Sequence, residues 1–186
     1  MNVRETDLPG VKVIEPDVFG DERGWFLENW RDERFTGHGI NASFAQVNTS
    51  HSRFGVLRGL HYQWPEPQGK LVWVTLGSVF DVAVDIRTDS PDFGRWTAVE
   101  LSAGNHRQLW IPEGFAHGFQ VLSENATFSY LCTRPYHADY DACIAWDDAR
   151  IGVGWPHKPS ALSAKDAAAP GIDQIAKERL PTCESC

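Results

Sequence analysis

Short runs of β-forming residues, separated by turn signals, recur along most of this 186-residue chain. Apolar, aromatic and β-branched residues fill runs at 11–14, 25–30, 44–48, 56–61, 70–76, 79–87, 96–101, 108–111, 118–122, 127–133 and 143–146. Many short strands at such a spacing predict an all-β fold, either a sandwich or a barrel. A chain of this length usually forms one domain. We therefore expect residues 1–186 to fold as a unit, with a flexible tail over about 181–186.

The run at 79–87 is the clearest of these strands. Its residues alternate between an apolar set (Phe80, Val82, Val84, Ile86) and a more polar set (Val79, Asp81, Ala83, Asp85, Arg87). Because successive side chains of a strand point to opposite faces, we expect the first set to face the core and the second to be more exposed.

Two other patterns concern Lys70 and the end of the chain. Lys70 shares a strand face with Val72 and Val74, so its ammonium either extends to water at the strand end or points into a lined cavity. The strand pattern alone favours the first position.

Helical periodicity occurs only between Pro170 and Pro181, where one apolar face is formed by Ile172, Ile175, Ala176 and Leu180.

Charge and hydropathy exclude several classes of function. The chain has 17 Lys and Arg against 25 Asp and Glu, and a net charge of −8 argues against broad binding to nucleic acid. The most apolar stretch, 71–86, holds too many polar residues to span a membrane. The first residues contain no signal-peptide segment and the four cysteines lack a disulfide spacing, so we expect a cytoplasmic location. Cys183 and Cys186 form half of a zinc-binding pattern, but the sequence contains no second half. We therefore expect a frayed tail here instead of a zinc site.

Two short motifs resemble those of the cupin barrels. The first combines Gly55, His61-Tyr62-Gln63, Lys70 and Gly77, and the second is the block 112–117, PEGFAH. In metal-binding cupins these motifs supply three histidines and a glutamate. Here Gln63 and Lys70 occupy two of those positions, whereas zinc and iron need about three or four protein ligands. We therefore expect a cupin barrel that uses no metal and no other cofactor.

Longer blocks give a more specific resemblance over about residues 10–180. In chain order they are 21–28 DERGWFLE, 46–50 QVNTS, 55–63 GVLRGLHYQ, 68–72 QGKLV, 79–87 VFDVAVDIR, 110–119 WIPEGFAHGF and 162–166 LSAKD. This series resembles the dTDP-4-dehydrorhamnose 3,5-epimerases, cupin-fold enzymes of dTDP-rhamnose synthesis. The resemblance implies a cupin-type double-stranded β-helix (jelly-roll) barrel with a few short helices, one near the C-terminus.

The implied reaction inverts C3 and C5 of dTDP-4-dehydro-6-deoxy-D-glucose. The C4 ketone acidifies the hydrogens on both flanking carbons, a base removes one, and an acid returns a proton to the opposite face of the enolate. By resemblance His61 is the base, because its ordinary pKa of about 6.5 suits proton transfer near neutral pH. Asp166 would fix its tautomer. Tyr130 matches the proton donor, and Lys70 matches the lysine that stabilises the enolate oxygen, which overrides the solvent-directed position above.

The resemblance also implies a binding site for the nucleotide sugar. Arg23 and Arg58 match positions that hold the diphosphate, which the planar guanidinium fork suits. Tyr136 matches an aromatic that stacks on thymine and comes from a neighbouring subunit, and a homodimer is implied. Other aligned substrate-site positions are Glu28, Gln46, Asn48, His117, Asp141 and Lys165, of which position 141 is often Glu in the family.

One geometric conflict follows from these assignments. Regular alternation puts Arg58 and His61 on opposite faces of their strand, although both are expected in the cavity. A bulge at Gly59 would bring both side chains to one face, because one extra residue redirects the chain.

Three alternatives remain open. An epimerase that acts at only one carbon, on a dTDP-4-keto-6-deoxy sugar of secondary metabolism, would keep His61, Tyr130 and Lys70. A non-catalytic cupin that binds nucleotide sugars would need no base and acid on opposed faces. A metal-dependent cupin dioxygenase is disfavoured by Gln63 and Lys70 at ligand positions.

Overall fold

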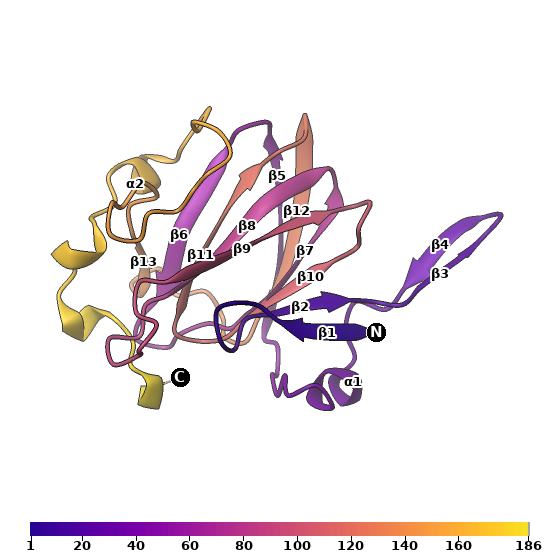
Figure 1. Ribbon diagram of the computed structural model, residues 1–186, viewed down its shortest axis with the longest axis horizontal. Coiled ribbons are helices and arrows are strands. Elements are labelled where there is room, and N and C mark those ends of the chain that lie inside the picture. The colour runs from indigo at the N-terminus through magenta and orange to yellow at the C-terminus, as the bar shows by residue number, and fades with distance from the viewer. Residues whose placement is uncertain (186) are drawn as a thin grey trace.

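The predicted strands assemble into two facing antiparallel sheets in a computed structural model, which describes residues 1–185 (Figure 1). The six-stranded sheet has the order β1-β2-β10-β7-β12-β5. Its strands are β1 Asn2–Glu5, β2 Lys12–Glu15, β10 Gln108–Ile111, β7 Lys70–Leu76, β12 Asn125–Cys132 and β5 Gln46–Arg53. The five-stranded sheet has the order β13-β6-β11-β8-β9. Its strands are β13 Asp141–Cys143, β6 Leu57–Gln63, β11 Phe115–Val121, β8 Ser78–Asp85 and β9 Trp96–Ser102. This arrangement confirms the predicted cupin-type all-β fold.

The main core lies between the two sheets. Val72 and Val74 of β7 and Phe128 of β12 contribute from one side, and Val79 of β8 and Phe119 of β11 contribute from the other. Both sheets place alternate side chains into this layer, and Phe119 and Phe128 also border the cavity described below.

The prediction of one exposed face on β8 is wrong. Val79, Asp81 and Ala83 are fully buried on the inner face of the strand, although they belong to the set expected to be wetter. The outer face is buried as well, because Val82 and Val84 pack into a second apolar cluster. The C-terminal part of the chain covers this face and contributes Ile144, Ile151, Ile172 and Leu180 to the cluster.

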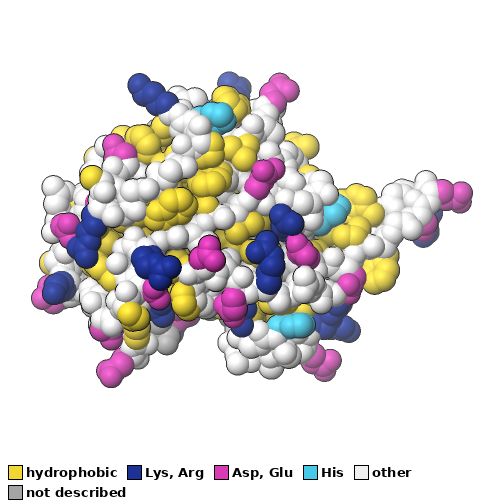
Figure 2. Space-filling model, in the orientation of Figure 1, with side chains coloured by type: hydrophobic (Ala, Val, Ile, Leu, Met, Phe, Trp, Pro, Cys, Tyr) yellow, Lys and Arg dark blue, Asp and Glu magenta, His cyan; other side chains and the backbone are white. Residues whose placement is uncertain are grey.

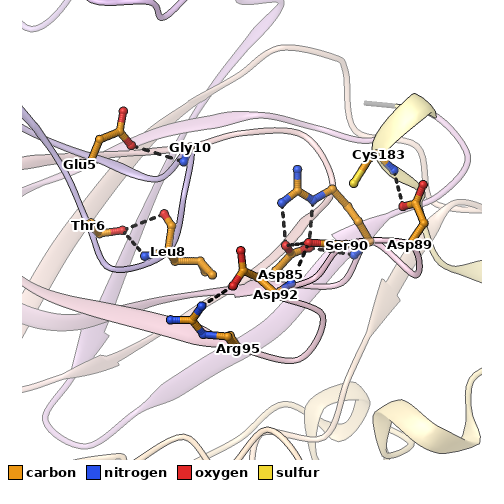
Figure 3. Close-up of polar contacts among 11 residues, drawn as sticks. Glu5, Thr6, Leu8, Gly10, Asp85, Asp89, Ser90, Asp92, Arg95 and Cys183 are labelled. Atoms are coloured by element: carbon orange, nitrogen blue, oxygen red, sulfur yellow. Dashed lines mark hydrogen bonds and ion pairs between the residues drawn. The ribbon is translucent and has the colours of Figure 1, made fainter.

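Asp85 at the end of β8 organises the loop that follows. Its carboxylate accepts hydrogen bonds from Arg87 Nε at 2.9 Å and from Ser90 Oγ at 2.6 Å (Figure 3). Figure 3 also shows the C-terminal segment reaching this loop, where the Cys183 backbone N–H donates to Asp89 at 2.7 Å. Cys186 lies outside the described residues, and with it the Cys183-x-x-Cys186 pattern.

The helices are short. They are α1 Asp32–Thr36, α2 Ala164–Ala167 and the single-turn 3₁₀ helices η1 Ile172–Gln174, η2 Lys177–Arg179 and η3 Cys183–Ser185. The predicted short helices, with one near the C-terminus, are confirmed, but the apolar face between Pro170 and Pro181 does not belong to one continuous helix. Ile175 and Ala176 are extended between η1 and η2, and the apolar spacing serves instead to pack an irregular segment against β8. Within residues 1–185, no helix is long and apolar enough to cross a bilayer.

A two-stranded arm projects from the six-stranded sheet (Figure 1). It consists of β3 Val18–Asp21 and β4 Gly24–Leu27, which pair only with each other among the described strands. Near its base, the Gln108 side chain donates to the Asn29 carbonyl at 3.0 Å, and Arg34 donates to Glu28 at 3.2 Å. The base of the arm is thus fixed to the body, whereas its tip extends away from it.

Candidate active site

A cavity of about 450 Å³ opens between the two sheets. Its walls come from β5, β7 and β12 of one sheet and from β6 and β11 of the other, with β13, α2 and the segment after β12 at the rim. Ten of the residues predicted for the site line it: Gln46, Asn48, Arg58, His61, Lys70, His117, Tyr130, Tyr136, Asp141 and Lys165. Residues that are far apart in the sequence therefore converge on one volume.

His61 and Asp166 form a hydrogen-bonded pair at the cavity wall. His61 Nε2 lies 2.6 Å from Asp166 Oδ1, the carboxylate is buried, and the ring is one-third exposed. Asp166 sits in α2, where Ser163 caps the helix by accepting a bond from the Asp166 backbone N–H. Burial raises the pKa of Asp166, but the hydrogen bond and charge of His61 outweigh it and hold that pKa below its ordinary value. An ionised Asp166 fixes the tautomer of His61 with the proton on Nε2, which leaves Nδ1 as the basic nitrogen.

The predicted bulge in β6 is confirmed. His61 pairs with His117 and Arg58 pairs with Phe119, so Gly59 and Leu60 together oppose the single residue Gly118. Gly59 has a φ of +135°, and a Cβ there would lie 2.5 Å from Gly118 Cα, so only glycine fits. The extra residue turns Arg58 and His61 into the same cavity.

Tyr130 faces the cavity from the opposite sheet. It lies on β12 directly opposite Asn48 of β5 and Val72 of β7. Burial raises the pKa of the Tyr130 phenol above its ordinary value, and the nearby Cys132 acts in the same direction. The phenol is therefore protonated at neutral pH and is available as a proton donor.

Lys70 is a buried lysine that lines the cavity. It is the first residue of β7, pairs in register with Cys132, and is only 8% exposed. Among residues 1–185 no carboxylate forms an ion pair with its ammonium group. Burial lowers the pKa of Lys70, although the nearby Cys132 and Asp141 act in the opposite direction. A buried cation without a partner carboxylate is suited to stabilise an oxyanion that forms beside it.

His117 and Asp81 form a second pair, deeper in the barrel. His117 Nε2 lies 3.0 Å from Asp81 Oδ2, the His117 side chain is 9% exposed, and Asp81 is fully buried. Burial raises the pKa of Asp81 above its ordinary value, against the lowering effect of His117. The pair holds the His117 ring in one orientation at the cavity wall.

The rim of the cavity carries a polar network. Lys165 Nζ donates to Asp141 Oδ2 at 2.7 Å, and the Tyr136 hydroxyl donates to the same oxygen at 3.2 Å. Arg58 Nε donates to Ser52 at 3.1 Å and leaves the rest of its guanidinium at the cavity. Tyr136 was expected from a neighbouring subunit, yet this residue lines the cavity of its own chain.

Two predicted residues lie away from the cavity of their own chain. Arg23, at the tip of the arm, has an 85% exposed side chain and bonds to Asp21. Glu28 lies at the base of the arm and forms ion pairs with Arg31 and Arg34. Neither residue is among those that line the cavity.

Sequence reasoning missed three residues of the site. Asp81 was assigned to an exposed face, and its burial depends on strand packing that no local pattern reveals. Cys132 shares a strand face with Tyr130, so the alternation of β12 could have identified it as a cavity residue. Gln63 was considered only as a replaced metal ligand, whereas its amide holds neighbouring backbone groups.

The donor set does not suit a metal ion. Within residues 1–185, no three His, Cys, Asp or Glu side chains converge in a way that could hold one. Lys70, which occupies the sequence position of the carboxylate ligand in metal-binding cupins, has no lone pair to offer a metal when protonated, and the Gln63 carbonyl already accepts a bond from the His137 N–H at 2.8 Å.

Known proteins resemble this chain along nearly its whole length. A family model described as dTDP-4-dehydrorhamnose 3,5-epimerase matches residues 5–174. The Salmonella typhimurium protein of that name is 54% identical over 177 residues, which cover 94% of this chain and 97% of that protein. A crystal structure of a 3,5-epimerase from Legionella pneumophila, in complex with dTDP-4-keto-L-rhamnose, is 50% identical and superposes with a TM-score of 0.95, covering 97% of both chains. A 3′-monoepimerase from Streptomyces bikiniensis, in complex with dTDP-quinovose, is 32% identical with a TM-score of 0.88, covering 97% and 93%.

Proposed function

The chain belongs to the dTDP-4-dehydrorhamnose 3,5-epimerase family, and we propose that His61, Tyr130 and Lys70 carry out that family's chemistry in the cavity between the sheets. The reaction is epimerisation at C3 and C5 of dTDP-4-dehydro-6-deoxy-D-glucose, which gives dTDP-4-dehydro-L-rhamnose for dTDP-L-rhamnose biosynthesis. The single-position alternative is not favoured, because identity to the 3,5-epimerases reaches 54% and identity to the monoepimerase is 32%.

One observation supports the proposed roles: His61 and Tyr130 line one cavity from two different sheets. His61 belongs to β6 of the five-stranded sheet, and Tyr130 belongs to β12 of the six-stranded sheet. A sugar ring bound between them presents one face to each group. Inversion at a carbon requires this arrangement, because the proton leaves from one face and returns to the other.

The proposed cycle moves two protons at each carbon. Nδ1 of His61 takes the hydrogen next to the C4 ketone, and Asp166 stabilises the resulting imidazolium. The electron pair passes to O4, where the ammonium of Lys70 stabilises the enolate, an effect typically worth about 3 kcal/mol for one such donor. Tyr130 then donates its phenolic proton to the opposite face of the same carbon. The imidazolium of His61 next releases its proton to water and the Tyr130 phenolate takes one up from water, which restores both groups. The second carbon then reacts in the same way after the ring shifts in the cavity.

Proton exchange tests this assignment. The enzyme is incubated with dTDP-4-dehydro-6-deoxy-D-glucose in deuterated water, and the C3 and C5 hydrogens are followed by NMR. We expect deuterium at both carbons, and dTDP-L-rhamnose after addition of the rhamnose reductase and NADPH. Exchange at one carbon would indicate a monoepimerase. No exchange, with binding shown separately, would overturn the catalytic roles and leave a sugar-binding cupin.

Tyr130→Phe separates the two proton transfers. This variant keeps His61, so it should still exchange the substrate hydrogen with solvent while it fails to invert the carbon. His61→Asn should lose both exchange and inversion. Inversion that persists in Tyr130→Phe would contradict the role of Tyr130 as the acid.

The arm supports a homodimer. Phe19, Trp25 and Phe26 are 62%, 61% and 68% exposed, and apolar side chains are visible on the arm in the surface view (Figure 2). An isolated two-stranded hairpin is marginally stable in water, so contact with a second copy would stabilise it. Arg23 at its tip would then supply positive charge to the diphosphate in the partner's cavity. Glu28, Gln46, Asn48, Arg58, His117, Tyr136, Asp141 and Lys165 complete the proposed substrate site.

Subunit mixing tests both the dimer and the position of Arg23. Arg23→Ala and His61→Asn subunits are each expected to have little activity. If Arg23 acts in the partner's cavity, the mixed dimer contains one intact site, and activity returns on mixing. No return of activity from dimers shown to have mixed, or a monomer in analytical ultracentrifugation, would overturn the proposal.

We also propose a cytoplasmic location, which the free thiols of Cys132, Cys143 and Cys183 support.

A further inference from the structure

The segment after β12 carries Tyr136 to the cavity rim without any strand to hold it. Residues 133–137 have no regular secondary structure, and Tyr136 is 56% exposed. An aromatic ring that stacks on a nucleobase contributes more to affinity when its position is fixed before the base binds, because less ordering is then needed. Some other group must therefore fix this backbone.

Three glutamine side chains hold the segment. Gln68 Nε2 donates to the Arg134 carbonyl at 2.8 Å. Gln46 Oε1 accepts the Tyr136 N–H at 2.7 Å. Gln63 Oε1 accepts the next N–H, that of His137, at 2.8 Å. Two consecutive backbone donors are thus satisfied by two side-chain amides.

Gln63 is the central member of this set. It is 4% exposed, and its Nε2 donates to the Glu66 carbonyl at 2.7 Å and to the Pro135 carbonyl at 3.4 Å. The same amide therefore ties the segment with Tyr136 to the loop that follows β6. Gln46 and Gln63 also belong to different sheets, β5 and β6, so the segment bridges both walls of the cavity.

We propose that Gln63 is a positioning residue for nucleotide binding, which acts through the backbone of residues 135–137 to hold the Tyr136 ring over the nucleobase site. The proposal rests on the proposed function, since it assumes a nucleoside diphosphate sugar at this rim. It assigns a role to a residue that occupies a metal-ligand position in other cupins. In this chain the amide of Gln63 is engaged by backbone groups on both sides, and it contributes to affinity instead of chemistry.

Gln63→Leu tests the proposal, with Gln120→Leu as a matched control. Gln120 is likewise a buried glutamine, and its amide bonds both the carbonyl and the N–H of His157 at 2.9 and 3.0 Å, away from the cavity. We expect Gln63→Leu to raise the KM of the sugar nucleotide and the Kd of dTDP by about tenfold or more, while kcat changes far less. Gln120→Leu should lower stability but leave both constants unchanged. A similar rise in both variants would mean that the effect is only loss of stability and would overturn the proposal.

A double variant separates positioning from direct contact. If Gln63 acts through the ring, Tyr136→Ala already removes its effect, and Gln63→Leu should add little to the Kd of dTDP in that background. Fully additive losses would overturn the proposal, because they indicate that Gln63 contacts the nucleotide independently. If Gln63→Leu does not fold, Gln46→Leu removes the acceptor of the Tyr136 N–H, and unchanged dTDP affinity there would overturn it as well.

The binding measurement is independent of turnover. Titration calorimetry with dTDP alone reports on the rim, whereas deuterium exchange in the wild-type protein reports on the chemistry. Weakened dTDP binding in Gln63→Leu together with no exchange in the wild type would retain the role of Gln63 and reject the epimerase roles of His61 and Tyr130.

Discussion

The two histidine–carboxylate pairs differ in depth, although their histidines are direct partners. His61 and His117 pair in register across β6 and β11. The His61 ring is 33% exposed and bonds Asp166 on α2, whereas the His117 side chain is 9% exposed and bonds Asp81 on β8. The pKa of Asp166 lies below its ordinary value and that of Asp81 lies above it.

We propose that this difference separates a proton-transfer pair from a binding pair. The ionised Asp166 would compensate an imidazolium at His61, and the ring is partly open to solvent, which suits the proposed proton transfer. A charge on the deep pair is costly, because Asp81 is excluded from water. We therefore expect His117 to orient the substrate through a hydrogen bond, while His61 carries the chemistry.

The largest expected effect distinguishes the two rings directly. His61→Asn should lower kcat by about 10² to 10⁴-fold, the usual contribution of a general base. His117→Asn should cost about tenfold, as expected for one hydrogen bond to the substrate. Both kcat values are measured with the reductase-coupled assay, and dTDP binding of each variant checks that the site is intact. Equal losses in kcat would remove the distinction between the pairs.

The carboxylates give the second test of the same comparison. Asp166→Asn keeps the shape of the side chain but removes the charge that compensates the imidazolium, so we expect kcat to fall by about a hundredfold or more. Asp81→Asn keeps an acceptor for His117 and should reduce kcat by less than about tenfold. The pH profile of kcat/KM adds a second readout, since only Asp166→Asn should shift its acidic limb. A larger loss in Asp81→Asn would make the deep pair the catalytic one.

Local patterns in the sequence predicted where strands occur, but they did not predict which strand faces are buried by other parts of the chain. Alternation identified Val79–Arg87 as a strand, and β7 and β10 have the predicted boundaries. It failed for Asp81, because the C-terminal segment covers the outer face of β8 and leaves neither face wet. The strand β1, Asn2–Glu5, was missed because its residues are mostly polar and its backbone pairing with β2 defines it.

The residues of the site were predictable only from the sequence segments that resemble the epimerase family. His61 and Asp166 are 105 residues apart in the chain, and only the resemblance connected them before the fold brought them to 2.6 Å. The bulge at Gly59 followed from a conflict between two expected orientations, so it needed both the blocks and strand geometry. The projection of Arg23 away from its own cavity could not be derived, since the position of an arm depends on contacts beyond its own residues.

The smallest expected effect is on stability, where the two carboxylates should differ in their dependence on pH. The folded-state pKa of Asp166 is lowered from 3.8, so its ionised form stabilises the fold at neutral pH. This contribution begins to be lost when the pH falls below 3.8, and it is gone once the pH is below the lowered folded-state pKa. The folded-state pKa of Asp81 is raised from 3.8, so its ionised form costs stability at neutral pH, and this cost disappears as the pH falls through the raised value toward 3.8. In thermal unfolding at pH 7, Asp166→Asn should therefore have a lower Tm than the wild type, and Asp81→Asn an equal or higher one. Between pH 7 and pH 4 the deficit of Asp166→Asn should persist, while the Tm of Asp81→Asn relative to the wild type should decline. Parallel pH dependence in the two variants would mean that depth does not separate the pairs, and the rate differences above would then need another cause.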